Sequence, residues 1–219
     1  MDRRHTFHEP LGDSCGAEKE VGSGLPLHVH KKAVRALGIA ESFMKGVSQR
    51  SVLAGVVMRA DRVLDGFGFA TVTVGGMDAT DQVIALHASL HRDDINVLLL
   101  NGCVISWYNV IDLHRVAEAT RRPLLCVTYE ASEGLDPYFL ELFPEDGPHR
   151  VDVYHKNGGR TPLTLPTGHT VYLRFLDMTL DEATGLLRKF TLHGAVPEPL
   201  RVARLLARSL MKTWSPLAT

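Results

Sequence analysis

The chain has 219 residues, of which 45% are hydrophobic and 22% are charged, and its formal net charge at pH 7 is −1. This length and this apolar fraction suit one α/β domain with a substantial core. The near-zero net charge excludes a protein that a global positive field draws onto nucleic acid or a membrane, so any nucleic-acid binding must come from local basic clusters.

Residues 1–30 are predicted to form a flexible tail, because they mix glycine, proline and charged residues without a sustained hydrophobic period. They lack the apolar segment of a signal peptide, and no stretch of the chain is long and apolar enough for a membrane span. Cys103 and Cys126 lie beside apolar runs and are typical of reduced core residues. We therefore expect a cytoplasmic protein that does not bind membranes, with residues 31–219 as a single domain.

The first strand is predicted over residues 34–43, where Arg35 is the only charge before Glu41. By the period of two, Leu37, Ile39 and Glu41 share one face of this strand. A carboxylate then lies in line with apolar side chains, and burying it is costly unless it is paired or binds a metal. Alternatively, Glu41 only marks the point where the strand reaches solvent.

Alternating and helical hydrophobic patterns define the elements that follow. In chain order they are strand 51–59, strand 63–74, helix 79–91, strand 96–100, helix 109–120 and strand 123–128. The first three strands have such short connections that they must form an antiparallel meander. The later strands follow helices and must be parallel, right-handed crossovers. This order predicts a mixed α/β sheet of the ribonuclease H-like topology.

The remainder of the chain is less regular. We expect a helix at 136–142, strands at 149–155 and 170–176, and helices at 180–190 and 198–212. Arg201, Arg204, Arg208 and Lys212 form one stripe along the last helix. This stripe is either a solvated face or a surface that follows a phosphate backbone.

Acidic and amide side chains fall where neighbouring strands of this topology end. Glu41 lies on the first strand, Asp78 and Asp81 precede or begin the first helix, and Asn101 follows the fourth strand. Mg²⁺ takes hard oxygen ligands, typically two or three carboxylates completed by water and a phosphate oxygen. The pattern therefore predicts a metal site formed by Glu41, Asp78 and Asp81, with Asn101 as an uncharged oxygen donor.

Each of these side chains also has a structural explanation. Asp78 and Asp81 fit a capping box, as the N-cap and the third residue of a helix. Asn101 precedes a glycine, which is typical of a turn. Asn109 and Asp112 fit the N-cap and the first turn of the second helix. A carboxylate has enough lone pairs for both roles, so these alternatives are not exclusive.

Several ordered motifs resemble the archaeal endonuclease dU family, formerly a domain of unknown function. They are residues 38–43 (GIAESF), 53–59 (LAGVVMR), 65–67 (DGF), 74–80 (VGGMDAT) and 109–112 (NVID). The resemblance extends from about residue 35 to at least residue 129. That family is in turn similar, more remotely, to endonuclease V, a Mg²⁺-dependent ribonuclease H-like enzyme that nicks DNA near deaminated bases.

The resemblance implies an endonuclease that depends on Mg²⁺, or on Mn²⁺ in its place, and repairs DNA containing deoxyuridine, the product of cytosine deamination. It assigns Glu41, Asp78 and Asp81 to the metal, and Asn101 to orienting a ligand water. Residues assigned to the substrate are Arg35, Gly75, Gly76, Tyr108, Asn109 and Asp112. The damaged base is expected to flip into a pocket near the aromatic residues 107–108.

Two alternatives follow from the departures of this chain from endonuclease V. Asn101 stands where that enzyme has an aspartate, and its lysine after the fifth strand has no counterpart around residues 128–130. One alternative is therefore a nucleic-acid-binding protein that kept the fold and lost cleavage. The other is a metal-dependent enzyme that acts on a small nucleotide, because no basic groove is obvious.

Overall fold

A computed structural model describes residues 33–214, so the predicted tail at 1–30 lies outside the described residues. The strands are β1 (Arg35–Ser42), β2 (Arg50–Arg59), β3 (Leu64–Thr73), β4 (Val97–Asn101), β5 (Val104–Ile105), β6 (Asn109–Val110), β7 (Leu124–Thr128), β8 (Thr161–Thr164) and β9 (Thr170–Leu176). The helices are α1 (Ala79–Ser89), α2 (Leu113–Thr120), α3 (Asp136–Leu142), α4 (Gly147–Lys156), α5 (Leu180–Phe190) and α6 (Glu198–Trp214). Within the described range, no helix has the length and apolar character needed to cross a membrane.

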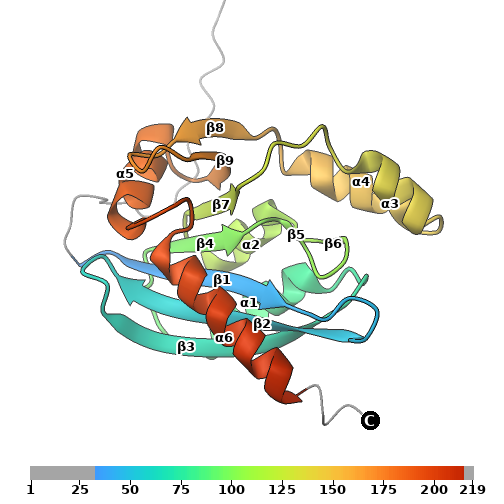
Figure 1. The fold of residues 1–219 in the computed structure, drawn as a ribbon, viewed down its shortest axis with the longest axis horizontal. Helices are drawn as coiled ribbons and strands as arrows, with labels where there is room; N and C mark the ends of the chain where they lie inside the picture. The colour runs from blue at the N-terminus through green and yellow to red at the C-terminus, as the bar shows by residue number, and fades with distance from the viewer. Residues whose placement is uncertain (1–32, 215–219) are drawn as a thin grey trace, which may run out of the picture.

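Seven strands form one mixed sheet in the order β3-β2-β1-β4-β7-β9-β8 (Figure 1). The meander β1-β2-β3 is antiparallel, and β4 lies parallel to both β1 and β7. These pairings confirm the predicted meander and parallel crossovers. As a consequence, the carboxyl ends of β1, β4 and β7 lie side by side at one edge of the sheet.

Helices cover both faces of this sheet. Leu37 of β1 packs with Val83 of α1 and Val116 of α2 in one buried cluster, whereas Val127 of β7 packs with residues of α5 and α6 in another. Helix α6 crosses the sheet over β1 and β2 (Figure 1). Gly38 permits this approach, because a Cβ atom at that position would lie only 2.5 Å from Cβ of Pro199.

The structure corrects the predicted strand at 149–155, which forms helix α4 instead. Val151 and Val153 alternate with polar residues, and this alternation is the pattern of a strand. However, Pro148 lies in the first turn of α4, where its fixed φ favours a helix. The helix also packs against α3, and this tertiary contact further favours the helix. The short edge strand β8 was not predicted.

The second helix begins at Leu113 rather than at residue 109, because residues 104–110 form the hairpin β5-β6. Its three-residue turn has positive φ angles at Ser106 (45°), Trp107 (61°) and Tyr108 (65°). Each non-glycine residue in this left-handed region costs on the order of 1–2 kcal/mol. Three in succession require strong contacts from the rest of the molecule to hold them.

Candidate active site

The predicted first-strand carboxylate lies at the edge where parallel strands end together. Glu41 near the end of β1 and Asn101 at the end of β4 line the same small cavity, together with apolar residues that include Leu53 and Ile105. The cavity has a volume of about 10 Å³. This is space for one species the size of a water molecule. The fold therefore brings two oxygen-bearing side chains onto one small, mostly enclosed space.

Two hydrogen bonds hold the Glu41 carboxylate. Ser51 Oγ donates to Oε2 at 3.0 Å, and the Ser106 N–H donates to Oε1 at 3.4 Å. Burial raises the pKa of Glu41 above its usual value, against the opposing effects of these hydrogen bonds and of the Arg204 charge. Burial thus disfavours the charged carboxylate, and a bound cation would offset that cost.

Two oxygens on residues that line this cavity or contact Glu41 are buried and have no hydrogen-bond partner within the described residues. They are Oδ1 of Asn101 and Oγ of Ser106, the residue whose N–H contacts Glu41. Buried polar atoms nearly always have a partner, so an unpartnered one calls for an explanation. Carboxylate, amide and hydroxyl oxygens are hard donors, and such donors suit Mg²⁺ or Mn²⁺.

Asp78 directs its carboxylate toward the end of β3 instead of capping α1. It occupies the N-cap position of α1 without a capping hydrogen bond, so the predicted capping box does not form. Its oxygens accept from Thr73 N–H at 3.0 and 3.1 Å, from Thr73 Oγ1 at 2.8 Å and from Asn109 Nδ2 at 2.7 Å. Burial opposes these hydrogen bonds, but together they hold the pKa of Asp78 below its usual value. Both oxygens are therefore already engaged.

Asp81 lies on the surface of α1, where its side chain is 62% exposed. It forms an ion pair of 2.7 Å with Nη2 of Arg115 on α2. Among residues 33–214, no group of three or more histidine, cysteine or acidic side chains is arranged to hold a metal ion. The structure thus does not assemble Glu41, Asp78 and Asp81 into one cluster, and leaves Glu41 and Asn101 as the paired donors.

Arg150 of α4 connects three of the residues that were assigned to the substrate. Its guanidinium donates to the backbone carbonyls of Gly76 at 3.0 Å, Tyr108 at 2.7 Å and Gly75 at 2.7 Å, and its side chain is almost fully buried. Gly75 in turn donates its N–H to the carbonyl of Ser106 at 2.8 Å. Arg150 therefore fixes the strained hairpin and the Gly75–Gly76 loop together. The sequence gives no local sign of this role, because the pattern around Arg150 predicts a strand.

Asn109 and Asp112 also have structural partners. Asn109 is buried, accepts from the Ala79 N–H at 3.1 Å and donates to Asp78, so it joins the hairpin to the start of α1. Asp112, rather than Asn109, is the N-cap of α2 and also binds Lys156 Nζ at 2.8 Å.

Arg35 begins β1, whereas Glu41 lies near its end, so about 20 Å of extended chain separates the two residues. The Arg35 side chain binds Asp65 at 2.5 Å and lies 3.3 Å from Asp94. It does not belong to the site around Glu41.

Two residues from other elements complete the edge. Burial raises the pKa values of Glu41 and of Tyr129, which follows β7, and the charge of the exposed Arg204 on α6 opposes this rise in both. The Tyr129 hydroxyl is buried without a partner in the described chain, and burial raises its pKa. Arg201 of the same helical stripe is paired with Glu198 at 2.5 Å. Arg204 was predicted only as one member of that stripe, and no local signal indicated Tyr129.

The order and directions of the strands define a ribonuclease H-like fold, of the kind found in endonuclease V. The chain is similar to the crystal structure of Ciona intestinalis endonuclease V in complex with a 23mer DNA containing an inosine followed by a ribo-adenosine. That match has a TM-score of 0.57 and 16% identity, and it covers 83% of this chain and 87% of that chain. A protein of unknown function from Archaeoglobus fulgidus matches with a TM-score of 0.70 and 24% identity over 81% of this chain and 98% of that chain.

Comparison of the amino-acid sequence with known families identifies the family of this chain. Residues 32–211 match the family described as Endonuclease dU. A UPF0215 protein of Pyrobaculum calidifontis is 33% identical over 171 residues, which cover 78% of this chain and 93% of that relative. The chain therefore belongs to the Endonuclease dU family, which confirms the resemblance carried by its motifs.

Proposed function

We propose that this protein is a metal-dependent endonuclease that cleaves DNA at deoxyuridine. The observation that carries the proposal is the pairing of Glu41 with Asn101 at the shared carboxyl edge of β1 and β4, around a cavity with room for one small species. Membership of the Endonuclease dU family supports the substrate. The DNA complex of the similarly folded endonuclease V supports nucleic acid as the ligand.

Glu41 and Asn101 fit a Mg²⁺ or Mn²⁺ ion, because Asn101 Oδ1 is a buried oxygen without a partner in the described chain. Mg²⁺ is usually held by one or two carboxylates and completes its coordination with water and substrate phosphate oxygens. Asp78 fits less well, since Thr73 and Asn109 engage both of its oxygens. When bound, the ion would lower the pKa of a ligand water and neutralise charge on the phosphate.

The residues around the ion have separate tasks in this proposal. Ser51 and the Ser106 N–H orient the Glu41 carboxylate. Arg204 supplies a positive charge beside Glu41 and binds a phosphate oxygen of the DNA. Arg204 of α6 thereby supplies a positive charge in place of the lysine that endonuclease V has after its fifth strand, which has no counterpart around residues 128–130.

The hairpin aromatics offer a surface for the flipped base. Tyr108 is packed against other rings, with Tyr138 stacked at 6.0 Å and Phe139 and Phe143 edge-on. Trp107 is half-buried, has one ring neighbour, Tyr108, at 5.3 Å in an edge-on arrangement among the described residues, and carries Lys45 over its ring at 4.2 Å. Because a base needs an accessible ring face, we assign stacking to Trp107 rather than Tyr108. Lys45 has a long, flexible side chain that can move off the Trp107 ring when a base stacks there. Its charge would then contact the phosphate.

The test is incubation of the purified protein with Mg²⁺ or Mn²⁺ and a duplex that contains one deoxyuridine. We expect a nick near the lesion in wild type and in Asp81→Asn, and its loss in Glu41→Gln. Asp81→Asn is the matched control, because it removes one acidic charge from an exposed ion pair outside the cavity. Cleavage by Glu41→Gln at the wild-type rate would overturn the site assignment.

A second candidate function is DNA binding without cleavage. It is favoured by the single carboxylate of the cavity, because Asn101 brings no negative charge to a metal. Detectable binding of the deoxyuridine duplex without any nick, with either metal, would decide for this candidate.

A further inference from the structure

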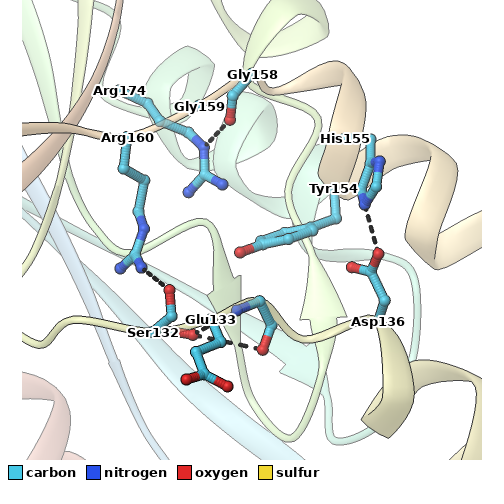
Figure 2. Close-up of a pocket in the computed structure, with 10 residues that line it drawn as sticks. Ser132, Glu133, Asp136, Tyr154, His155, Gly158, Gly159, Arg160 and Arg174 are labelled. Carbon is cyan, nitrogen blue, oxygen red and sulfur yellow. Dashed lines mark hydrogen bonds and ion pairs between the residues drawn. The ribbon is translucent and has the colours of Figure 1, made fainter.

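A second cavity lies beyond the end of β7, between α4 and the loops that contain residues 132–134 and 158–160 (Figure 2). Its volume is about 430 Å³. Pockets that hold small organic ligands have volumes of about 300–1,000 Å³. Glu41 and Asn101 do not line this cavity, so an inference about it stands apart from the proposed cleavage.

Two guanidinium groups face this cavity, one from Arg160 and one from Arg174 of β9 (Figure 2). Within residues 33–214, neither forms an ion pair with a carboxylate. Arg160 donates to the carbonyls of Glu130 at 3.0 Å and Ser132 at 2.9 Å. Arg174 donates to the carbonyl of Gly158 at 2.7 Å. These neutral acceptors orient the two groups without cancelling their charges.

Arg174 is 7% exposed, and a buried charge is costly unless it is compensated. Its Nη1 donates to Sγ of Cys103 at 3.4 Å. A hydrogen bond from Cys126 and the Arg174 charge lower the pKa of Cys103 to about 7. Near neutral pH the Cys103 thiol is only partly ionised, so it compensates the charge of Arg174 only in part. The neighbouring Arg160 has no counter-charge from this thiol.

The acidic residues of this cavity do not neutralise the arginines. Asp136 is bound to Nε2 of His155 at 2.7 Å. Figure 2 shows the Glu133 carboxylate directed away from both guanidinium groups, whereas the Tyr154 hydroxyl points toward them. The Arg174 guanidinium carbon lies 4.9 Å from the centre of the Tyr154 ring.

The glycines of the cavity leave its wall open. A Cβ atom added at Gly159 would meet no atom within 4 Å, and its φ lies outside the left-handed region. A larger residue at this position is therefore compatible with the backbone and would project into free space. This gives a way to obstruct the cavity without removing a charge.

We propose that this cavity binds the phosphate group of a nucleotide, with Arg160 and Arg174 on the phosphate oxygens and Tyr154 beside the organic part. Two convergent guanidinium groups match the geometry and charge of a phosphate, which accepts several charge-assisted hydrogen bonds. An aromatic ring next to them suits a base or sugar. The phosphate belongs either to a free nucleotide or to a nucleic-acid strand.

The test is binding of three probes to the full-length protein by isothermal titration calorimetry. The probes are inorganic phosphate, dUMP and a single-stranded oligonucleotide with a 5′-phosphate. We expect dUMP or the oligonucleotide to bind, and inorganic phosphate to compete. Preference for dUMP assigns the cavity to a free nucleotide, whereas preference for the oligonucleotide assigns it to a strand.

Two variants address the site by different means. Arg160→Gln removes a charge and is expected to weaken binding about 10-fold or more. Gly159→Leu keeps both charges and obstructs the space, and a similar loss is expected. Arg188→Gln, an exposed change on α5, is the control for charge and should bind like wild type.

Absence of binding by all three probes would overturn the proposal, and so would wild-type affinity in both Arg160→Gln and Gly159→Leu. Glu41→Gln separates this inference from the proposed function. It should lose cleavage and keep the binding of dUMP or the short oligonucleotide. A protein that binds these probes but never nicks DNA would support the cavity and contradict the nuclease.

Discussion

The backbone N–H of Ser106 donates to the carboxylate of Glu41 across 65 positions of sequence. Ser106 has a positive φ, as do Trp107 and Tyr108, so the contact is made by a strained turn. Strain of this kind persists only where surrounding contacts enforce it, and it is found at functional sites. The position of the Glu41 carboxylate thus depends on the residues that hold the hairpin.

Arg150 is the main such residue, and Arg150→Met should strongly destabilise the protein. The change leaves the partly buried carbonyls of Gly75, Gly76 and Tyr108 without their donor. We expect a loss of about 1–3 kcal/mol in the free energy of unfolding, measured by urea denaturation. Arg115→Met is the control, since its ion pair with Asp81 is exposed and should contribute less than about 1 kcal/mol. Equal losses in both variants would contradict the role of Arg150.

Metal binding should stabilise the protein through Glu41. A ligand that binds only the folded state adds about 2.7 kcal/mol when its concentration is 100 times its Kd. We expect Mg²⁺ or Mn²⁺ to raise the Tm of wild type relative to a sample in EDTA. Glu41→Gln should lose this rise, and Asp81→Asn should keep it. A rise of the same size in Glu41→Gln would place the metal elsewhere.

Arg204→Gln should weaken DNA binding more than Arg208→Gln. Both residues are exposed on α6 one helical turn apart, but only the charge of Arg204 acts on Glu41 and Tyr129. Loss of one phosphate contact should reduce the slope of log K against log salt concentration by about 1. Fluorescence anisotropy over a range of salt concentrations measures this slope. Indistinguishable slopes for the two variants would contradict a role for Arg204 in DNA binding.

The acid stability of the protein should depend on Asp65. Hydrogen bonds from Arg35 and Arg92 lower the pKa of Asp65 from its ordinary value of 3.8. A depressed pKa contributes stability that is present above the unfolded-state value and is lost as the pH falls through the folded-state value. Below about pH 4, wild type should therefore lose stability more steeply than Asp65→Asn. Urea denaturation at a series of pH values checks this, and parallel pH profiles would contradict it.

Much of the fold could be predicted, because the responsible patterns are local. The meander follows from β-rich runs with short links, and the strands around α2 follow from apolar runs flanking a helical period. The segment at 149–155 could not be assigned in this way, since the alternation of Val151 and Val153 fits a strand, whereas Pro148 and packing against α3 favour the helix.

The candidate site was less accessible to prediction. Glu41 and Asn101 were found because topology alone brings the ends of β1 and β4 together. The engagement of Asp78 by Thr73 and Asn109 depends on side-chain directions that spacing does not encode. The turn at Ser106 and the role of Arg150 depend on contacts between distant segments of the chain, so no local sequence pattern predicts them.

Helix α6 has a consequence for how the candidate site is completed during folding. The Glu41 carboxylate comes from the first strand, whereas Arg204 comes from the last helix, and Pro199 docks over Gly38. Without α6 in place, Glu41 would lack the positive charge of Arg204. In the proposed nuclease, binding of a DNA phosphate by Arg204 beside Glu41 would therefore begin only once α6 has docked on β1.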